Sequence, residues 1–249
     1  MEEKNYRVLR IEEQLYGCEE LPEGQPVLCD VLLEAADGTQ RVLPYPDAEL
    51  TRLDINEGST VTLRDHRLTR AAHKVYFTRH GETVWNVENK ICGMTDSPLT
   101  EKGRAQAREL GEKLRASGLR IDEILYSPLS RAADTARAIA EATGIPARCE
   151  PRLREQCFGR YEGTPRDGEE FRISKTHFAD RYSGGESMMQ LAQRIYNLLD
   201  KLRADTDKTY LLVAHNGIAR VVQSYFYDMT NEEYAAAGIK NCEFVEFTF

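Results

Sequence analysis

The feature that most constrains this chain is a short, wholly apolar run that ends at a histidine. Residues 210–214, Tyr-Leu-Leu-Val-Ala, lead directly into His215-Asn216-Gly217. A run of this kind is typical of a central strand covered on both faces of a sheet. A second run, residues 75–78, ends in the same way at Arg79-His80-Gly81. If both runs are parallel central strands, the two histidines emerge at the same edge of the sheet.

Strand and helix patterns alternate from Lys74 onward. A helix is expected from Thr100 to about residue 116, with Ala105, Leu110 and Leu114 on its apolar side. Further helices are expected over residues 130–143, 186–204 and 218–227, and further strands over residues 121–126 and 243–249, the last at an edge. Strands separated by helices predict an α/β fold, here a three-layer α/β/α sandwich with a mostly parallel central sheet. Ligands are then expected at the carboxyl ends of its strands.

The first 70 residues show a different pattern. Short strands are expected over residues 6–11, 27–34, 40–43 and 59–63, and Asp37-Gly38 between two apolar runs is a hairpin signal. Residues 64–73 are charged and lack strand alternation, so we expect a linker there. The sequence thus predicts a small β-rich module in residues 1–70 and a larger α/β domain in residues 71–249.

The composition excludes several classes of partner. The chain has 249 residues and a formal net charge of −8, so nucleic acid, which is held by clustered Lys and Arg, is not an expected partner. Its apolar runs are too short to cross a membrane, and its charged N-terminus shows no secretory or transit pattern, so we expect a cytoplasmic protein. Six cysteines occur without a C-x-x-C pair, which favours reduced thiols over a zinc site or a disulfide framework.

Several side chains suit phosphate chemistry. The guanidinium fork of Arg79 matches a phosphate with two parallel hydrogen bonds, and a neutral His80 imidazole keeps a lone pair for attack. Arg131, in the first turn of a predicted helix, offers a second guanidinium for a phosphoryl group in transfer, whose charge spreads over three equatorial oxygens. Asn86 could donate an amide hydrogen to the same phosphate, and Gly81 lets the backbone approach a ligand closely.

A set of short motifs in a fixed order carries a family resemblance. The motifs are Arg79-His80-Gly81-Glu82-Thr83-x-Trp85-Asn86, Asp96-x-x-Leu99-Thr100, Ser127-Pro128-x-x-Arg131, Glu155-x-x-Phe158-Gly159-x-Tyr161-Glu162-Gly163, Gly184-Gly185-Glu186-Ser187 and His215-x-Gly217. Together they resemble the histidine phosphatase superfamily, in its branch with cofactor-dependent phosphoglycerate mutases and small phosphatases. The resemblance covers roughly residues 74–249, so residues 71–249 are expected to be a catalytic domain with a phosphoglycerate mutase-like fold.

The resemblance implies a role for each of these residues. His80 is implied as the nucleophile that forms a transient phosphohistidine, and Glu155 as the proton donor, with Glu82 as its competitor for that role. The implied phosphate pocket contains Arg79, Asn86, Arg131 and His215, and we count the neighbours Gly81 and Asn216 with the substrate-binding residues. No metal and no cofactor is expected, because two arginines and a second histidine supply the positive charge that a metal ion provides elsewhere.

Three readings of the function compete. A phosphatase is favoured over a mutase, because only about thirty residues separate Glu155 from Gly184 and leave little chain for a lid that excludes water. A catalytically dead binder of phosphorylated ligands is the third reading, disfavoured because every proposed catalytic side chain is present. The substrate is expected to be a small phosphate ester whose identity the sequence leaves open. Three roles remain open for the N-terminal module: it could cover the site, mediate a homodimer or bind a partner.

Two departures from the family pattern affect the site. Asn216 stands where a second glycine is common, and asparagine tolerates left-handed backbone conformations. Cys92-Gly93-Met94 replaces a more usual aromatic-containing loop. Cys92 and Cys157 fall in segments expected to line the site, and the first interpretation of each is a small packing residue. The alternative for Cys92 is that, if exposed near two arginines, it has a depressed pKa and senses oxidants.

Overall fold

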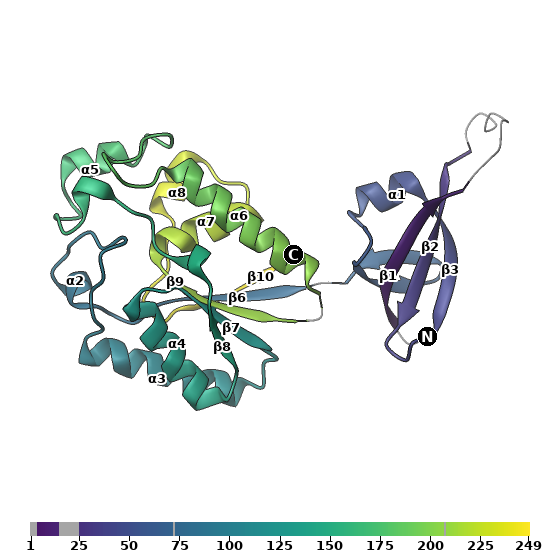
Figure 1. Ribbon diagram of the computed structural model, residues 1–249, viewed down its shortest axis with the longest axis horizontal. Helices are drawn as coiled ribbons and strands as arrows, with labels where there is room; N and C mark the ends of the chain where they lie inside the picture. Colours follow the sequence, from purple (N-terminus) through teal and green to yellow (C-terminus); the bar gives the residue numbers. More distant parts are fainter. Residues whose placement is uncertain (1–3, 15–24, 72, 207) are drawn as a thin grey trace. The chain divides into compact units, whose positions relative to one another are not determined.

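The computed structural model describes residues 4–14, 25–71, 73–206 and 208–249 (Figure 1). The chain divides into two compact units, Met1–Ala72 and His73–Phe249, where the sequence analysis placed the division between residues 70 and 71. Each unit has its own sheet and its own buried core, and they are described in turn.

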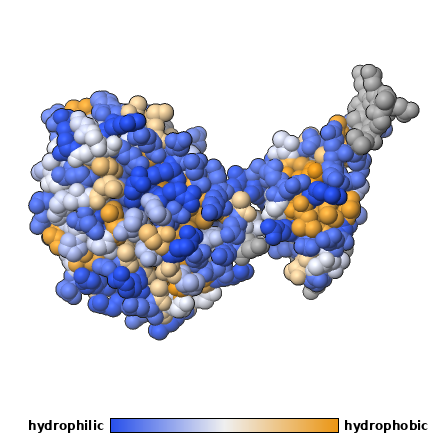
Figure 2. Space-filling model, in the orientation of Figure 1, coloured by the Kyte–Doolittle hydropathy of each residue, from blue (hydrophilic) through white to orange (hydrophobic). Residues whose placement is uncertain are grey.

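In its described residues, the N-terminal unit is a five-stranded antiparallel sheet with one short helix. Its strands lie in the order β3-β2-β1-β4-β5. They are β1 (Lys4–Glu13), β2 (Leu28–Ala35), β3 (Gln40–Pro46), β4 (Thr60–Arg64) and β5 (Arg67–Arg70), and helix α1 (Asp47–Arg52) connects β3 to β4. Burial alternates along β2, so that Val31 and Leu33 join Val8 and Val61 in the core. This alternation is the period of a sheet with one buried face. The visible face of this unit also carries a contiguous hydrophobic patch, whereas the second unit, His73–Phe249, is mainly hydrophilic on its visible face (Figure 2).

The expected linker over residues 64–73 is wrong in part, because it contains strand β5. Asp65 and His66 adopt positive φ angles of 48° and 62° and form the two-residue turn of a β4–β5 hairpin. Such turns match the twist of the strands they join. Leu68 is the side chain of β5 that enters the core. A four-residue strand with one buried position gives too short an alternation to be detected in the sequence.

The second unit is built on a mixed five-stranded sheet in the order β10-β6-β9-β7-β8. Its strands are β6 (Lys74–Arg79), β7 (Glu123–Tyr126), β8 (Ala147–Cys149), β9 (Tyr210–Ala214) and β10 (Phe244–Thr248). The pairs β6–β9, β9–β7 and β7–β8 are parallel, and β10 pairs with β6 in the antiparallel direction at one edge. The expected central strand and edge strand therefore lie where the sequence placed them.

Helices cover both faces of this sheet, which makes it an α/β unit of three layers (Figure 1). Its long helices are α3 (Glu101–Ser117), α4 (Ser130–Thr143), α6 (Met188–Ala204) and α7 (Asn216–Phe226), and its shorter helical segments are α2 (Val84–Val87), η1 (Pro151–Leu153), η2 (Gly159–Tyr161), α5 (Glu169–Ser174) and α8 (Asn231–Ala236). Strand β9 is wholly apolar because its side chains pack against helices on both faces of the sheet. Leu211 and Val213 pack with α3 and α4, while Leu212 and Ala214 pack with α6 and α7.

Some local expectations for this unit need correction. Ala105 is exposed on α3, and Ala107 takes the buried position instead, together with Leu110 and Leu114. Strand β8 and helices α5 and α8 were not expected, because all three are short and mostly exposed. Within the described ranges, no helix combines the length and apolar character needed to cross a membrane.

Candidate active site

The two histidines that follow β6 and β9 lie side by side. The parallel register pairs Arg79 with Ala214, and the backbone N–H of His80 donates to the carbonyl of Ala214 over 3.0 Å. The imidazole rings of His80 and His215 are 5.2 Å apart between centroids, at an interplanar angle of 59°. The expected convergence at the carboxyl ends of the central strands is therefore present.

The hydrogen bond of His80 fixes its reactive nitrogen. Its Nδ1 lies 2.7 Å from the carbonyl oxygen of Gly81, and because a carbonyl can only accept, Nδ1 carries the proton. Burial, followed by the nearby charges of Arg131 and Arg79, holds the pKa of His80 well below its usual range. The ring is therefore neutral at neutral pH and keeps a lone pair on Nε2.

His215 is fully buried and is held by the neighbouring strand end. Its Nε2 lies 2.6 Å from the hydroxyl of Ser127, the residue that follows β7. The backbone N–H of Ser127 donates to the carbonyl of Val213 in β9. Burial and then the charge of Arg131 also keep the pKa of His215 well below its usual range. Within the described residues its Nδ1 is buried without a hydrogen-bond partner, which is the state expected of a group that meets a ligand.

Two arginines flank the histidines. Arg79 donates through Nη1 to the carbonyl of Ile239 over 3.0 Å, and burial lowers its pKa to about 10. Arg131, fully buried in the first turn of α4, donates through Nη2 to the carbonyl of Gly93 over 2.7 Å. The Nε atoms of both arginines are buried and have no partner in the described part of the chain. Arginine donors of this kind suit an anionic ligand.

Glu155 is positioned at the N-terminus of α7. One carboxylate oxygen accepts from the backbone N–H of Gln156 over 2.9 Å, and the other accepts from that of Gly217 over 3.1 Å. Gly217 is required for this approach, since a Cβ there would lie 2.5 Å from the carboxylate. Arg194 supports the arrangement because it pairs with Glu186 and donates to the backbone carbonyl of Glu155 over 3.4 Å.

Glu82, the competitor for the proton-transfer role, lies in a different environment. Its carboxylate accepts from the Lys102 ammonium over 2.8 Å and from the Thr100 hydroxyl over 3.0 Å, at the start of α3. These partners, with Lys102 first, lower its pKa. Glu82 does not line the cavity that contains His80 and Glu155.

That cavity, here called the histidine pocket, has a volume of about 130 Å³. The expected site residues Arg79, His80, Asn86, Glu155 and Asn216 line it together with Gly217. The fully buried Arg131 and His215 do not line it, but the charge of Arg131 acts on both histidines.

Gly81 also does not line the histidine pocket, and it has another structural role. Its N–H donates to the Thr135 hydroxyl over 3.1 Å, and a Cβ at Gly81 would lie 2.3 Å from the carbonyl of Gly103. The glycine is needed for close packing between the His80 turn and the first turn of α3.

The two asparagines are fixed by backbone and side-chain donors. The Asn86 Oδ1 accepts from the N–H of Thr83 over 3.1 Å and from the Asn241 amide over 3.2 Å, which leaves the Asn86 amide nitrogen as its donor group for a ligand. Asn216 is the first residue of α7 and has no positive φ, so the left-handed conformation considered for it is not used. Its Oδ1 accepts from the N–H of Ile239 over 3.0 Å.

The prediction of a reactive Cys92 is contradicted. Cys92 lines the histidine pocket and lies partly buried, with its sulfur 3.3 Å from the carbonyl of Thr95. Burial raises its pKa, and this effect exceeds the opposing charge of Arg131. A thiol with a raised pKa carries little thiolate, so Cys92 is not activated towards oxidants.

Sequence reasoning missed three cations of the histidine pocket: Arg166, Lys175 and Arg220. Arg220 lies one helical turn after Asn216 on α7, so its spacing could have indicated it. Arg166 and Lys175 come from the polar segment around α5, whose composition is the same as that of a solvated loop. No cluster of three or more His, Cys, Asp or Glu side chains suited to a metal ion occurs in the described ranges.

Comparison with known proteins agrees with this geometry. Residues 75–249 match the model of the histidine phosphatase superfamily (branch 1), and the chain therefore belongs to that superfamily. A relative in Enterobacter sp. (strain 638), named probable phosphoglycerate mutase GpmB, is 42% identical over 154 residues, which is 59% of this chain and 70% of that protein.

Solved structures share the fold of the second unit. A mycobacterial glucosyl-3-phosphoglycerate phosphatase is 28% identical, with a TM-score of 0.62 over 71% of this chain and 90% of that one. The α-ribazole phosphatase of Shigella flexneri is 24% identical, with a TM-score of 0.60 over 70% of this chain and 89% of that one, which is a likeness of fold.

Proposed function

We propose that this protein is a phosphatase that hydrolyses small phosphate monoesters through a phosphohistidine on His80. The observation that carries the proposal is the hydrogen bond from His80 Nδ1 to the Gly81 carbonyl, since it leaves a neutral Nε2 as nucleophile. Superfamily membership and the phosphatases among the structural neighbours support it.

In the first step His80 Nε2 attacks phosphorus and the bond from phosphorus to the ester oxygen breaks. Arg79 and, through its nearby charge, the buried Arg131 stabilise the charge that develops on the transferring group. The neutral His215 ring lies beside His80, and its buried Nδ1 has no partner among the described residues. Glu155, in its protonated form, gives its proton to the leaving oxygen. A positioned acid of this kind contributes on the order of 10²–10⁴-fold.

In the second step water attacks phosphorus and the bond from phosphorus to Nε2 breaks. Glu155 now takes a proton from the water, which returns the carboxyl group to its starting state. Inorganic phosphate leaves and His80 is again neutral. No step in this sequence requires a metal ion, since the arginines supply positive charge.

A phosphoglycerate mutase is the second candidate, because the GpmB relative is named as one. A mutase must keep its phosphoenzyme from water. Between Glu155 and Gly184 the chain forms only η2, the short helix α5 and connecting turns. A segment this short offers little chain to exclude water from the site, which favours hydrolysis over a mutase. Incubation with 2,3-bisphosphoglycerate and a monophosphoglycerate separates the two: isomerisation faster than phosphate release would favour the mutase.

The test of catalysis itself is the His80→Ala variant. We expect its kcat/KM for p-nitrophenyl phosphate to fall at least about 10³-fold, as for loss of other catalytic nucleophiles. His177→Ala is the matched control, because His177 is exposed and lies outside the histidine pocket. Circular dichroism checks that both variants fold. Unchanged turnover by His80→Ala would overturn the nucleophile, and an inactive wild-type protein would favour a binding protein instead.

A further inference from the structure

Three cations of the histidine pocket have no carboxylate partner in the described part of the chain. Arg166, Lys175 and Arg220 line the pocket, and none of them forms an ion pair there. The Nε of Arg166 donates to the backbone carbonyl of Lys90 over 2.8 Å. The Nε of Arg220 donates to the backbone carbonyl of Ala237 over 2.6 Å. Their terminal nitrogens therefore stay available. Arg131 pairs with Asp96 over 3.3 Å, but Arg79 also lines the pocket, so four cations face one carboxylate, that of Glu155. This is more positive charge than one phosphate dianion requires.

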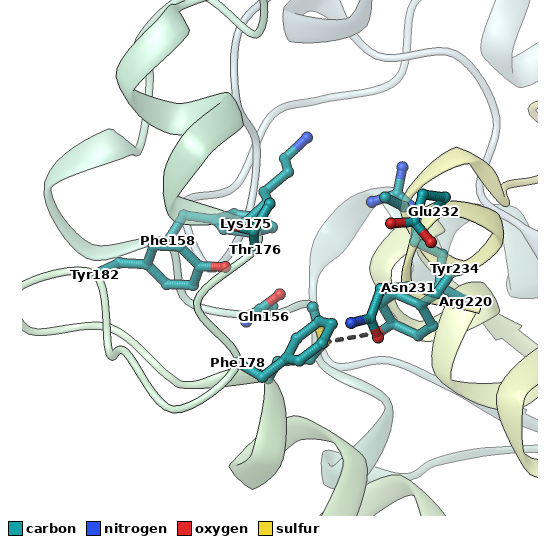
Figure 3. A pocket seen from close by; sticks show the side chains of 12 residues that line it. Gln156, Phe158, Lys175, Thr176, Phe178, Tyr182, Arg220, Asn231, Glu232 and Tyr234 are labelled. Carbon is teal, nitrogen blue, oxygen red and sulfur yellow. Dashed lines mark hydrogen bonds between the residues drawn. The ribbon is translucent and has the colours of Figure 1, made fainter. Parts of the chain in front are cut away.

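Two of these cations stand at the border with a second cavity. This side pocket has a volume of about 150 Å³ and shares Phe158, Lys175 and Arg220 with the histidine pocket. Figure 3 shows Lys175 and Arg220 on facing walls, one from the segment after α5 and the other from α7. Phe178 and Tyr234 add aromatic surface below them (Figure 3).

The environment of Lys175 favours an anionic neighbour. Its ammonium lies 4.4 Å from the ring centroid of Phe171 and has no hydrogen bond to any described residue. Burial, followed by the charges of Arg220 and Arg166, lowers its pKa to about 8. A desolvated cation without a counterion is costly, and a bound anion offsets that cost.

The carboxylates of the two cavities restrict where an anion can bind. Glu155 belongs to the histidine pocket, and both of its oxygens accept backbone hydrogen bonds. Glu232 is exposed and lines the side pocket but not the histidine pocket, and it forms no ion pair with Arg220, which lines both. An anion is therefore best placed at the border, between Lys175 and Arg220.

We propose that Lys175 and Arg220, with Arg166 nearby, bind a second anionic group of the substrate while its phosphate lies at His80. The substrate class is then a small phosphate monoester that carries a further carboxylate or phosphate. This inference rests on the proposed function and narrows its substrate.

A three-carbon series of esters tests the proposal with the full chain. Propane-1,3-diyl bisphosphate and 3-(phosphonooxy)propanoate carry a second anion, and 3-hydroxypropyl phosphate is the matched compound without one. Relative to 3-hydroxypropyl phosphate, we expect kcat/KM to be at least about tenfold higher for one or both compounds that carry a second anionic group, which corresponds to one charge-assisted hydrogen bond. The preferred compound identifies the second group as phosphate or carboxylate.

Variants connect this preference to the two side chains. In Lys175→Gln and Arg220→Gln the ratio of kcat/KM between the anionic and the neutral ester should fall about tenfold, whereas Lys175→Arg should keep it. Arg172→Gln is the charge-matched control, because Arg172 is exposed on α5 and lines neither cavity. Its ratio should equal that of the wild type.

Isothermal titration calorimetry of the same esters with His80→Ala measures binding separately from turnover. A preference for the anionic esters in this variant supports the second site even if hydrolysis fails, in which case only the proposed function falls. Equal binding and equal kcat/KM for all three esters, or a preference that survives both Lys175→Gln and Arg220→Gln, would overturn the second anion site.

Discussion

In the proposed mechanism, the chemistry depends on two neutral histidines. Burial and nearby guanidinium groups lower the pKa of both His80 and His215, so that neither is protonated at neutral pH. The arginines proposed to bind phosphate thus also keep the proposed nucleophile in its neutral form. A histidine with a raised pKa would be protonated in the same pH range and would have no lone pair to offer.

This electrostatic arrangement predicts the acid limb of the pH profile. The neutral form of His80 is the active form, and it is lost only as pH falls through its lowered pKa. We expect kcat/KM, corrected for titration of the substrate, not to decline as pH falls through about 6.5, the ordinary value for histidine, and to decline only below it. A midpoint at or above the ordinary value would contradict this account of the site.

The assignment of Glu155 predicts a dependence on the leaving group. In Glu155→Gln, kcat for an alkyl phosphate should fall about 10²-fold or more, because an alkoxide needs a proton to leave. The loss should be smaller for p-nitrophenyl phosphate, whose phenolate leaves readily without one. Glu82→Gln is the matched control, since Glu82 pairs with Lys102 outside the pocket. An equal or larger leaving-group effect in Glu82→Gln would move the proton donor to Glu82.

Short motifs predicted the centre of the site better than its walls. His80, Arg79 and His215 follow strand ends, so the sequence pattern and the topology of a parallel sheet place them together. Arg166 and Lys175 could not be found in this way, because their position depends on how the segment around α5 folds back. For Cys92, the packing interpretation agrees with the structure and the alternative of a depressed pKa does not, because burial of a loop thiol cannot be read from its charged neighbours.

At the scale of elements, the turn after β6 and the start of α3 pack with almost no space between their backbones. A Cβ on Gly103 would lie 2.0 Å from the carbonyl of Glu82, and one on Gly81 would lie 2.3 Å from the carbonyl of Gly103. Both glycines are therefore required by close approach of two backbones. The contact fixes the His80 loop against a long helix.

This contact predicts the effect of one methyl group. Gly103→Ala should lower the free energy of unfolding by about 2 kcal/mol, because overpacking against backbone outweighs the higher helix propensity of alanine. Gly168→Ala is the matched control, since its nearest contact would be an ordinary 3.4 Å. Urea denaturation of both variants measures the difference. A Gly103→Ala protein as stable as the Gly168→Ala protein would show that the contact can relax.

The elements that the sequence predicted well are those with a long, consistent pattern. Helix α4 has the predicted bounds because it keeps the helical period from end to end, and strand β9 has them because its run is apolar throughout. Strand β5 was missed because it presents a single buried side chain, Leu68. Helices α5 and α8 have six residues each, too few for a helical period to stand out from a polar loop.

At the scale of the whole molecule, the site residues all belong to the second unit. His73–Phe249 has a complete sheet and cores on both of its faces. A chain limited to residues 73–249 should therefore fold and keep the wild-type kcat/KM for p-nitrophenyl phosphate. Circular dichroism confirms folding, and steady-state kinetics give the rate. A folded but inactive product would show that the N-terminal unit takes part in catalysis.

The central claim is that His80 carries the phosphoryl group during turnover. The most direct measurement is to quench the enzyme in alkali during turnover of p-nitrophenyl phosphate and to map the phosphorylated peptide by mass spectrometry. We expect a phosphoryl group on His80 that is stable to alkali and lost in mild acid. A phosphoryl group on any other residue, or a His80→Ala protein that turns over as fast as the wild type, would contradict it.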